Sequence, residues 1–298
     1  MTDQFADTRQ MVEAGEISTD LSFFYRRGSF SSEIRGRQIG THLQAKLNPT
    51  EGFEDDVCIL VKQLPKTLLR NRGLSLNREN TYVDILDYSG GVQWLTGRPD
   101  VKVIVASKSA QQFLSDRFKN PLTFIPQHHC NFQRLLKPLR PVKTVAYIGL
   151  ATTPPAWAET VNQAVAKMGL EMRYFTDFKT RQDVVAAYLQ TDIQFTWYDD
   201  TMPDHWRRMK NALKVVNAAS FGIPTVASLE PAYEAECHGW YRPVSTLADA
   251  MDLIWDLRLS MDSPALALKS SFWVNQLSFI AEPYHIDHIV KQYQELAQ

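Results

Sequence analysis

The chain has 298 residues, which is enough for two domains of ordinary size with separate hydrophobic cores. Its 44% hydrophobic and 22% charged residues are typical of a globular protein and exclude extended disorder. The formal net charge of −1 excludes a protein-wide attraction to nucleic acid or to anionic membranes.

The sequence shows no pattern typical of a secreted or membrane protein. No apolar run reaches the roughly 18 residues that a membrane span needs. The N-terminus MTDQFADTRQ has no basic-then-apolar signal pattern. Three cysteines, Cys58, Cys130 and Cys237, are far apart and indicate neither a disulfide framework nor a metal site. We therefore expect a cytoplasmic protein with reduced thiols.

The first half of the chain alternates apolar runs with helical segments. Continuous apolar runs such as VCILV are typical of strands that are buried on both faces of a sheet. Strands are expected at 21–25, 57–61, 82–87, 101–106 and 122–126, and helices from 32, over 66–72 and from 107. The repeated order of strand, loop and helix predicts a parallel, doubly wound sheet.

A glycine-bearing loop follows the first expected strand. Gly28 and the start of the next helix should lie at the carboxyl edge of the sheet, where open α/β folds bind ligands. Four basic residues crowd this edge and favour an anionic ligand, although a solvated basic loop is the alternative. They are Arg26, Arg27, Arg35 and Arg37. Together with Lys66 and the arginines after it they could also meet a nucleic-acid backbone.

The second half repeats the β/α rhythm after a proline-bearing linker at 133–142. Strands are expected at 144–149, 171–175, 192–197, 225–227 and 240–243, and helices over 154–168, 181–190, 206–217, 247–257, 265–279 and 286–296. Two parallel sheets with separate cores follow from this repetition.

Residues 205–233 read as a helix, a glycine turn and a buried strand. Trp206, Met209, Leu213 and Val216 recur at helical spacing as a core stripe, and a polar stripe runs beside them. The polar stripe comprises Lys210, Lys214 and Asn217. Gly222 suits the left-handed position after a helix, and Pro224 stops the helix before the strand.

This stretch resembles the donor-binding region of GT-B nucleotide-sugar glycosyltransferases of the group 1, or family 4, type. Lys214, Gly222 and Pro224 match their pattern K-hh-E-A-hh-h-G-h-P-hhh, where h is apolar. Asn217 and Met209 stand where these enzymes carry the two glutamates of an E-x7-E motif. Residues 124–132 are similar to the segment at which GT-B chains leave the first domain.

The resemblance implies two Rossmann-like domains that face a cleft. Residues 1–135 would bind the acceptor, with the C-terminal helix 283–298 packing back onto them, and residues 143–282 would bind the nucleotide sugar. The loops around Gly28 and around Gly149 would face each other across the cleft.

The resemblance and the strand ends together suggest site residues. Lys214 would stabilise the leaving diphosphate. Asp84 or Asp87 would be the base, and the alternatives for that role are His42, His128 and His129. The predicted donor-binding residues are Gly28, Gly149, Thr152, Thr153, Lys210, Lys214, Asn217, Glu230 and Tyr233. The predicted acceptor-side or anion-binding residues are Arg26, Arg27, Arg35, His128 and His129.

The function implied is transfer of a sugar from a nucleotide-diphosphate sugar to a glycan or lipid-linked glycan, or less readily to nucleic acid. The resemblance implies a retaining, metal-independent enzyme without a cofactor. Because both motif glutamates are replaced, a non-catalytic protein that binds nucleotide sugar or glycan stays open, and so does an epimerase of the same fold.

Overall fold

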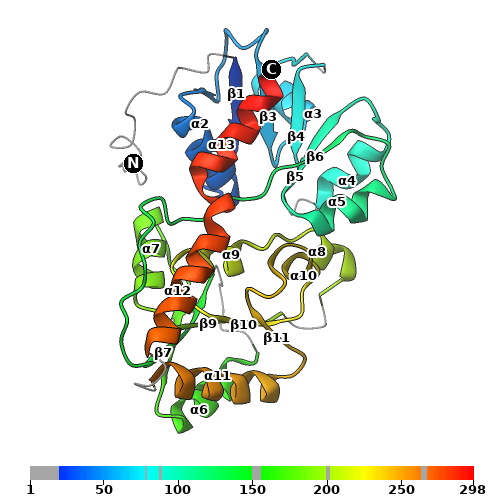
Figure 1. Cartoon of the computed structure of the whole chain (residues 1–298). Helices are drawn as coiled ribbons and strands as arrows, with labels where there is room; N and C mark the ends of the chain where they lie inside the picture. Colours follow the sequence, from blue (N-terminus) through cyan, green and yellow to red (C-terminus); the bar gives the residue numbers. More distant parts are fainter. Residues whose placement is uncertain (1–19, 78, 87–88, 150–155, 199–201, 263–266) are drawn as a thin grey trace. The chain divides into compact units, whose positions relative to one another are not determined.

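The computed structural model describes residues 20–298 except 78, 87–88, 150–155, 199–201 and 263–266. The described chain forms two compact units. We call residues 20–128, 203–211 and 286–298 the N-terminal unit, and residues 129–202 and 212–285 the C-terminal unit. Each unit is built on its own parallel sheet (Figure 1).

The N-terminal unit contains a six-stranded sheet in the order β2-β1-β3-β4-β5-β6. All its neighbouring strands are parallel. The strands are β1 (Leu21–Tyr25), β2 (Lys46–Leu47), β3 (Val57–Val61), β4 (Thr81–Asp84), β5 (Lys102–Val105) and β6 (Leu122–Phe124).

Helical segments of the N-terminal unit connect these strands. They are α1 (Phe30–Ser32), the π-helical turn η2 (Glu33–Gln38), α2 (Ile39–His42), α3 (Pro65–Arg72), α4 (Ser89–Thr96), α5 (Lys108–Ser115), α8 (Asp204–Arg208), α13 (Ile286–Gln294) and η5 (Glu295–Ala297). Ser107 begins α5 as predicted, because its hydroxyl accepts a hydrogen bond from the Ala110 amide at 3.0 Å.

Successive residues of β1 serve opposite faces of the sheet. The Phe23 ring lies 5.5 Å from the ring of Tyr293 in α13, whereas the Phe24 ring lies 5.3 Å from that of Phe53. Phe24 also belongs to the cluster that buries Leu68 of α3. Both faces are therefore covered, which explains why the strands are apolar throughout.

The C-terminal unit contains a five-stranded parallel sheet in the order β11-β10-β9-β7-β8. The strands are β7 (Thr144–Ile148), β8 (Glu171–Phe175), β9 (Ile193–Thr196), β10 (Thr225–Ser228) and β11 (Arg242–Val244). The helices are α6 (Ala158–Lys167), α7 (Arg181–Leu189), α9 (Leu213–Ser220), α10 (Pro231–Cys237), α11 (Leu247–Asp262), α12 (Ala267–Ala281) and η4 (Glu282–Tyr284).

Helices cover both faces of the second sheet too. In Figure 1, α6 and α11 lie below its strands and α9 and α10 lie above them. The lower core contains Val161 and Ile254, and the upper core contains Val216 and Tyr233. The predicted fold class, two doubly wound α/β sheets, is confirmed.

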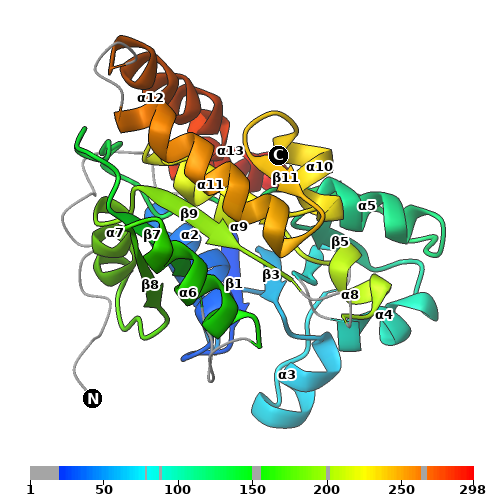
Figure 2. The same cartoon turned by 90° about the horizontal axis from the view of Figure 1, so that it is seen from below.

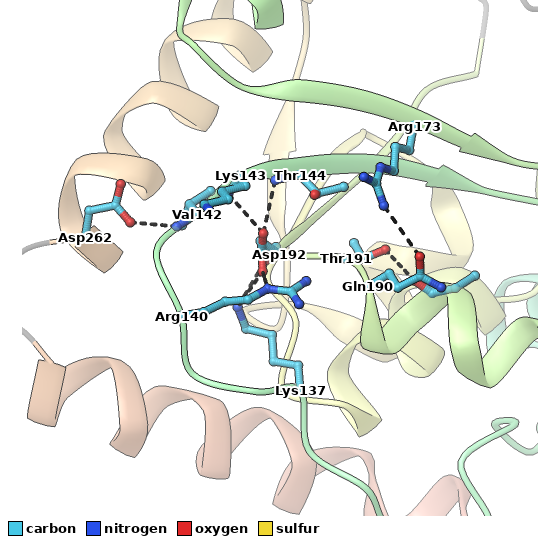
Figure 3. Close-up of polar contacts among 11 residues, drawn as sticks. Lys137, Arg140, Val142, Lys143, Thr144, Arg173, Gln190, Thr191, Asp192 and Asp262 are labelled. Atoms are coloured by element: carbon cyan, nitrogen blue, oxygen red, sulfur yellow. Dashed lines mark hydrogen bonds and ion pairs between the residues drawn. The ribbon is translucent and has the colours of Figure 1, made fainter.

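The segment that leads into β7 is anchored on Asp192, which is fully buried. Its carboxylate accepts hydrogen bonds from the amides of Lys143 and Thr144, both at 3.0 Å. Figure 3 shows Arg140 and Lys137 converging on the same carboxylate, with nitrogen-to-oxygen distances of 3.0 and 4.0 Å. These bonds hold the start of β7 in register beside the start of β9.

The helix predicted over 206–217 is wrong as a single element. It is two helices, α8 and α9, which end and begin on either side of residues 209–212 and belong to different units. Met209 is buried in the core of the N-terminal unit, and the Asn211 side chain donates to Gln127 at 2.9 Å. Tertiary contacts with α5 and its neighbours override the continuous helical period.

Four described elements have no counterpart in the sequence predictions: β2, α4, α10 and η4. β2 is only two residues long, and α4 begins with Ser89, Gly90 and Gly91, which are typical of a turn.

In the part of the chain that the structure describes, no helix combines the length and apolarity needed to cross a bilayer.

Candidate functional site

The site is built at the carboxyl edge of the sheet in the C-terminal unit. β7, β9 and β10 are neighbours in this sheet, so the residues that follow them meet at one edge. Gly149 follows β7, Tyr198 follows β9, and Ser228 ends β10. Figure 2 shows α9, which carries Lys214, beside β9 in the same unit.

The Lys214 side chain extends from the first turn of α9 to β7. Its Nζ donates to the Tyr147 hydroxyl at 3.2 Å and lies 3.5 Å from Thr196 Oγ1. The same nitrogen lies 4.4 Å from the ring centre of Tyr147 and 4.9 Å from that of Tyr198. Two aromatic faces and two hydroxyls thus orient this ammonium, which is a favourable environment for a cation.

Gly149 lies directly against this lysine. A Cβ placed on Gly149 would be 3.1 Å from Lys214 Cε, 3.2 Å from Nζ and 3.3 Å from the Tyr147 hydroxyl. The amide of Gly149 continues the sheet by donating to Phe175 at 3.1 Å. Position 149 therefore admits glycine because a side chain would compete with Lys214 for space.

Glu230 and Tyr233 lie at the same edge. The Ser228 hydroxyl donates to Glu230 Oε1 at 3.4 Å and accepts from the Tyr198 amide at 3.0 Å. Burial raises the pKa of Tyr233 well above its ordinary value, and the neighbouring Tyr198 and Glu230 act in the same direction. Burial also raises the pKa of Tyr147, so both tyrosines carry neutral hydroxyls at neutral pH.

The other members of the predicted polar stripe are Asn217 and Lys210. Asn217 is 6% exposed, and its amide oxygen accepts from the Cys130 amide at 2.8 Å, while the same side chain faces the Tyr188 hydroxyl. Lys210 belongs to the N-terminal unit. Donor contacts of Asn217 and Lys210 stay predictions.

Some predicted residues lie outside the described part of the chain. They are Asp87, Thr152 and Thr153.

Four further residues of this edge were missed by the sequence reasoning, because nothing local distinguishes them from ordinary strand residues: Tyr147, Thr196, Tyr198 and Ser228.

A second polar edge lies in the N-terminal unit after β1 and β3. Gly28 has a φ of 75°, and its amide donates to Glu33 Oε1 at 2.9 Å. Lys62, which the sequence reasoning missed, also has a positive φ, 53°, and its Nζ donates to the Ser31 hydroxyl at 3.0 Å. Arg26 and Arg27 are exposed beside this loop, as an anion-binding role requires.

Arg35 and Asp84 were predicted for separate roles, but the structure pairs them inside the N-terminal unit. Arg35 Nε lies 2.6 Å from Asp84 Oδ2, and the two side chains are 1% and 0% exposed. Arg35 also donates to the Ile125 carbonyl at 2.9 Å, and the Tyr293 hydroxyl donates to Asp84 at 3.1 Å. Both side chains are buried and paired with each other, and their predicted roles at a ligand stay predictions.

The histidines at 128 and 129 are each 2% exposed, and they belong to different units. His128 Nε2 lies 3.2 Å from the Ile34 carbonyl. The His129 ring lies 5.3 Å from the ring of His285 in an edge-to-face arrangement. His42 is paired with Asp287 at 3.3 Å, and burial lowers its pKa.

A shallow hollow of about 440 Å³ lies along α5 and β6, and none of the predicted site residues lines it. Among the described residues, no group of three or more His, Cys, Asp or Glu side chains is arranged to hold a metal ion.

No family model and no curated protein sequence matches the chain. Solved structures do match it. WaaG, a glycosyltransferase involved in lipopolysaccharide biosynthesis, has a TM-score of 0.58 at 8% identity, over 93% of this chain and 99% of WaaG. HepE from Anabaena, solved with UDP and glucose, has a TM-score of 0.56 at 12% identity, over 92% of this chain and 90% of HepE.

The pneumococcal O-GlcNAc transferase GtfA, solved with UDP and GlcNAc, has a TM-score of 0.50 at 11% identity. The match covers 81% of this chain and 56% of GtfA, so the chain spans little more than half the length of that protein. At such low identities the likeness concerns the backbone. The chain has the GT-B fold shared by these glycosyltransferases.

Proposed function

We propose that the protein is a glycosyltransferase that binds a nucleotide-diphosphate sugar in its C-terminal unit. The observation that carries the proposal is the position of Lys214, whose ammonium lies against Gly149 at the carboxyl edge of the sheet. Ligands of open α/β sheets bind at this edge. Two of the solved neighbours, HepE and GtfA, hold UDP.

In the proposed reaction Lys214 acts on the leaving group. The bond from the sugar to the diphosphate breaks, so negative charge grows on the diphosphate oxygen as the sugar moves to the acceptor. A fixed ammonium within contact of that oxygen stabilises the transition state more than the ground state. Because Lys214 supplies this charge, we propose that transfer is independent of a divalent metal.

Retention of the anomeric configuration is proposed from the sequence resemblance alone. We place the acceptor, a glycan or a lipid-linked glycan, on the N-terminal unit, where Arg26, Arg27 and Lys62 surround the loop after β1. A chelator should leave transfer unchanged, and nuclear magnetic resonance of the first product formed would report its anomeric configuration.

Lys214→Ala tests the central assignment. A panel of UDP, GDP, ADP, CDP and dTDP, each free and as its glucose conjugate, is screened by thermal shift, because a ligand that binds the native state raises its melting temperature. Lys214→Ala should weaken binding of the best nucleotide and slow sugar transfer or donor hydrolysis by about a hundred- to a thousandfold. Its own melting temperature should stay close to that of the wild type.

Lys167→Ala is the matched control, since it removes the same charge from an exposed residue of the same unit, in the last turn of α6 and outside the candidate site. It should leave nucleotide binding within about twofold of the wild type. If no nucleotide shifts the wild-type melting temperature, the proposed function is wrong. If Lys214→Ala binds and reacts like the wild type, the lysine is only a surface residue.

A protein that binds nucleotide sugar without transferring the sugar is the second candidate. The two positions of the E-x7-E glutamates favour it, because Met209 is buried in the other unit's core and the Asn217 amide is bonded to the backbone of Cys130. Tight donor binding without donor hydrolysis or transfer to any glycan would select this alternative.

A further inference from the structure

Lys214 is long and flexible, but Tyr147 is fixed. The Tyr147 ring packs 5.8 Å from the Trp157 ring and 6.4 Å from the Tyr174 ring, and the residue is 8% exposed. Burial within this aromatic cluster leaves the hydroxyl at one place, where the lysine ammonium meets it at 3.2 Å. A rigid group can therefore set the position of a mobile one.

The same tyrosine offers two kinds of contact to the ammonium. The hydroxyl accepts a hydrogen bond, and the ring face lies 4.4 Å from Nζ. Tyr198 contributes a second ring face at 4.9 Å. These contacts are with neutral groups, so they orient the cation without cancelling its charge.

The place at which the ammonium is held lies beside the main chain. Both Nζ of Lys214 and the hydroxyl of Tyr147 would be within 3.3 Å of a Cβ on Gly149. An anion that approaches the chain just after β7 would meet the lysine already in position. Groups that are oriented before binding need less reorganisation when the ligand arrives.

We propose that Tyr147 is a positioning residue, which holds the Lys214 ammonium beside Gly149 so that it meets the diphosphate of a nucleotide ligand. The inference rests on the proposed function, since it assumes that Lys214 is the diphosphate contact. Tyr147 acts through Lys214 and not on the ligand itself, which makes the assignment testable by a double-mutant cycle.

The cycle combines Tyr147→Phe with Lys214→Ala. The ligand is whichever of the free diphosphates UDP, GDP, ADP, CDP and dTDP binds the wild type most tightly. Calorimetry measures the dissociation constants of this diphosphate and of the corresponding monophosphate. Tyr147→Phe keeps the packed ring and removes only the hydroxyl. It should weaken binding of the diphosphate by about two- to tenfold, which is the usual effect of one hydrogen bond. The monophosphate should change less, because it lacks the second phosphate.

In the Lys214→Ala background the Tyr147→Phe change should have no further effect beyond about 1.5-fold, since the residue that it positions is gone. Tyr174→Phe is the matched control. Its ring lies in the same aromatic cluster, but its hydroxyl bonds the Asn162 side chain at 2.9 Å and not Lys214. It should leave the dissociation constants within about 1.5-fold of the wild type.

Each departure from these results has a defined meaning. If Tyr147→Phe weakened diphosphate binding equally in the wild type and in Lys214→Ala, the inference would be overturned, because Tyr147 would then act without Lys214. Tighter binding by Tyr147→Phe would overturn it too, since the hydroxyl would be holding the lysine away from the ligand. An unchanged dissociation constant in Tyr147→Phe, with weaker binding in Lys214→Ala, would overturn the inference and leave the proposed function standing.

Failure of the wild type to bind any of the five diphosphates would overturn the proposed function and the inference together. The melting temperature of each variant shows whether it is folded, and Tyr147→Phe should stay within a few degrees of the wild type because the aromatic cluster is retained. If it were unfolded, Lys214→Arg would replace it: an arginine reaches the same edge but changes the contact with Tyr147, and it should bind more weakly than the wild type. Wild-type affinity in Lys214→Arg would overturn the inference.

Discussion

Gly149 is the residue at which the candidate site leaves least room. In Gly149→Ala the new methyl group would approach Lys214 Cε and Nζ to 3.1 and 3.2 Å, so the flexible end of the lysine must move. We expect little change in melting temperature but weaker binding of nucleoside diphosphate, which calorimetry would measure. In Lys214→Ala the same substitution should have no further effect. Unchanged affinity in the single variant would show that the lysine's position does not matter.

The buried Lys137 should make the free energy of unfolding depend on pH. Its side chain is 1% exposed, and burial lowers its pKa from 10.5 to about 8 despite the nearby Asp192. Between pH 8 and pH 10.5 this lysine is protonated in the unfolded chain and neutral in the folded chain. Unfolding therefore takes up a proton, and a rising pH makes unfolding less favourable. The free energy of unfolding should therefore gain on the order of 3 kcal/mol from this residue between pH 8 and pH 10.5.

Lys137→Met should remove this gain, as measured by urea unfolding at a series of pH values. Lys143→Met is the control, because Lys143 is exposed and contributes only its amide to Asp192. The control should keep the wild-type pH dependence. A wild-type pH dependence in Lys137→Met would mean that the buried lysine does not titrate in this range.

At the scale of the elements, the turn between α9 and β10 depends on Gly222 for two reasons. Its φ is 72°, the left-handed conformation that the sequence indicated. A Cβ there would also lie 2.8 Å from the backbone oxygen of Val274 in α12. The first reason is local, whereas the second arises only when α12 packs on α9.

Gly222→Ala should therefore lower the free energy of unfolding by more than about 1 kcal/mol, the usual difference between glycine and alanine in this conformation. Gly222→Asn separates the two reasons, because asparagine tolerates the left-handed conformation but still carries a Cβ. Gly97→Ala, where nothing lies within 4 Å of the new Cβ, is the neutral control. If Gly222→Asn were as stable as the wild type, the contact with α12 would not restrict this position.

The break between α8 and α9 shows that a helical period in the sequence does not by itself establish a single helix. Met209 and Val216 are seven residues apart and both buried, as one helical stripe would require. They are buried in the cores of different units. Periodicity reports that a residue is buried, but it does not report which core receives it.

At the scale of the whole molecule, the last helix returns to the first sheet through Tyr293, whose hydroxyl donates to Asp84 across 209 residues of sequence. Asp84→Asn would leave the buried Arg35 guanidinium without its carboxylate. We expect a loss of about 3–5 kcal/mol in the free energy of unfolding, measured with urea. Glu282→Gln is the control, because its pair with Arg134 is partly exposed and should contribute at most about 1 kcal/mol.

The same variant tests the earlier hypothesis that Asp84 is the general base. Replacing a general base lowers turnover and changes the free energy of unfolding little. Replacing a structural carboxylate lowers the free energy of unfolding. Wild-type stability together with lost turnover in Asp84→Asn would contradict the structural role.

Much of the fold was predictable because its signals are local. Apolar runs such as Val57–Val61 and Thr144–Ile148 coincide with strands of the structure, and Ser107 begins its helix as expected. Elements that are short or rich in turn residues, such as β2 and α4, were missed for the same reason: a few residues carry too little periodicity. At the candidate site the sequence singled out Lys214 from its helix stripe and Gly149 from the end of a strand, and their roles in binding stay predictions.

By itself the sequence determined that two α/β sheets form, that Lys214 lies in the polar stripe of a helix and that Gly149 lies at the end of a strand. These features are readable because periodicity, caps and turns act within a few residues of each other. Only the tertiary structure decided which side chains meet. Tyr147 and Lys214 are 67 residues apart, and Arg35 and Asp84 are 49 apart, yet each pair is in contact. Packing brings such residues together, and no local pattern records the partner, because the contact depends on how strands and helices are arranged around the core.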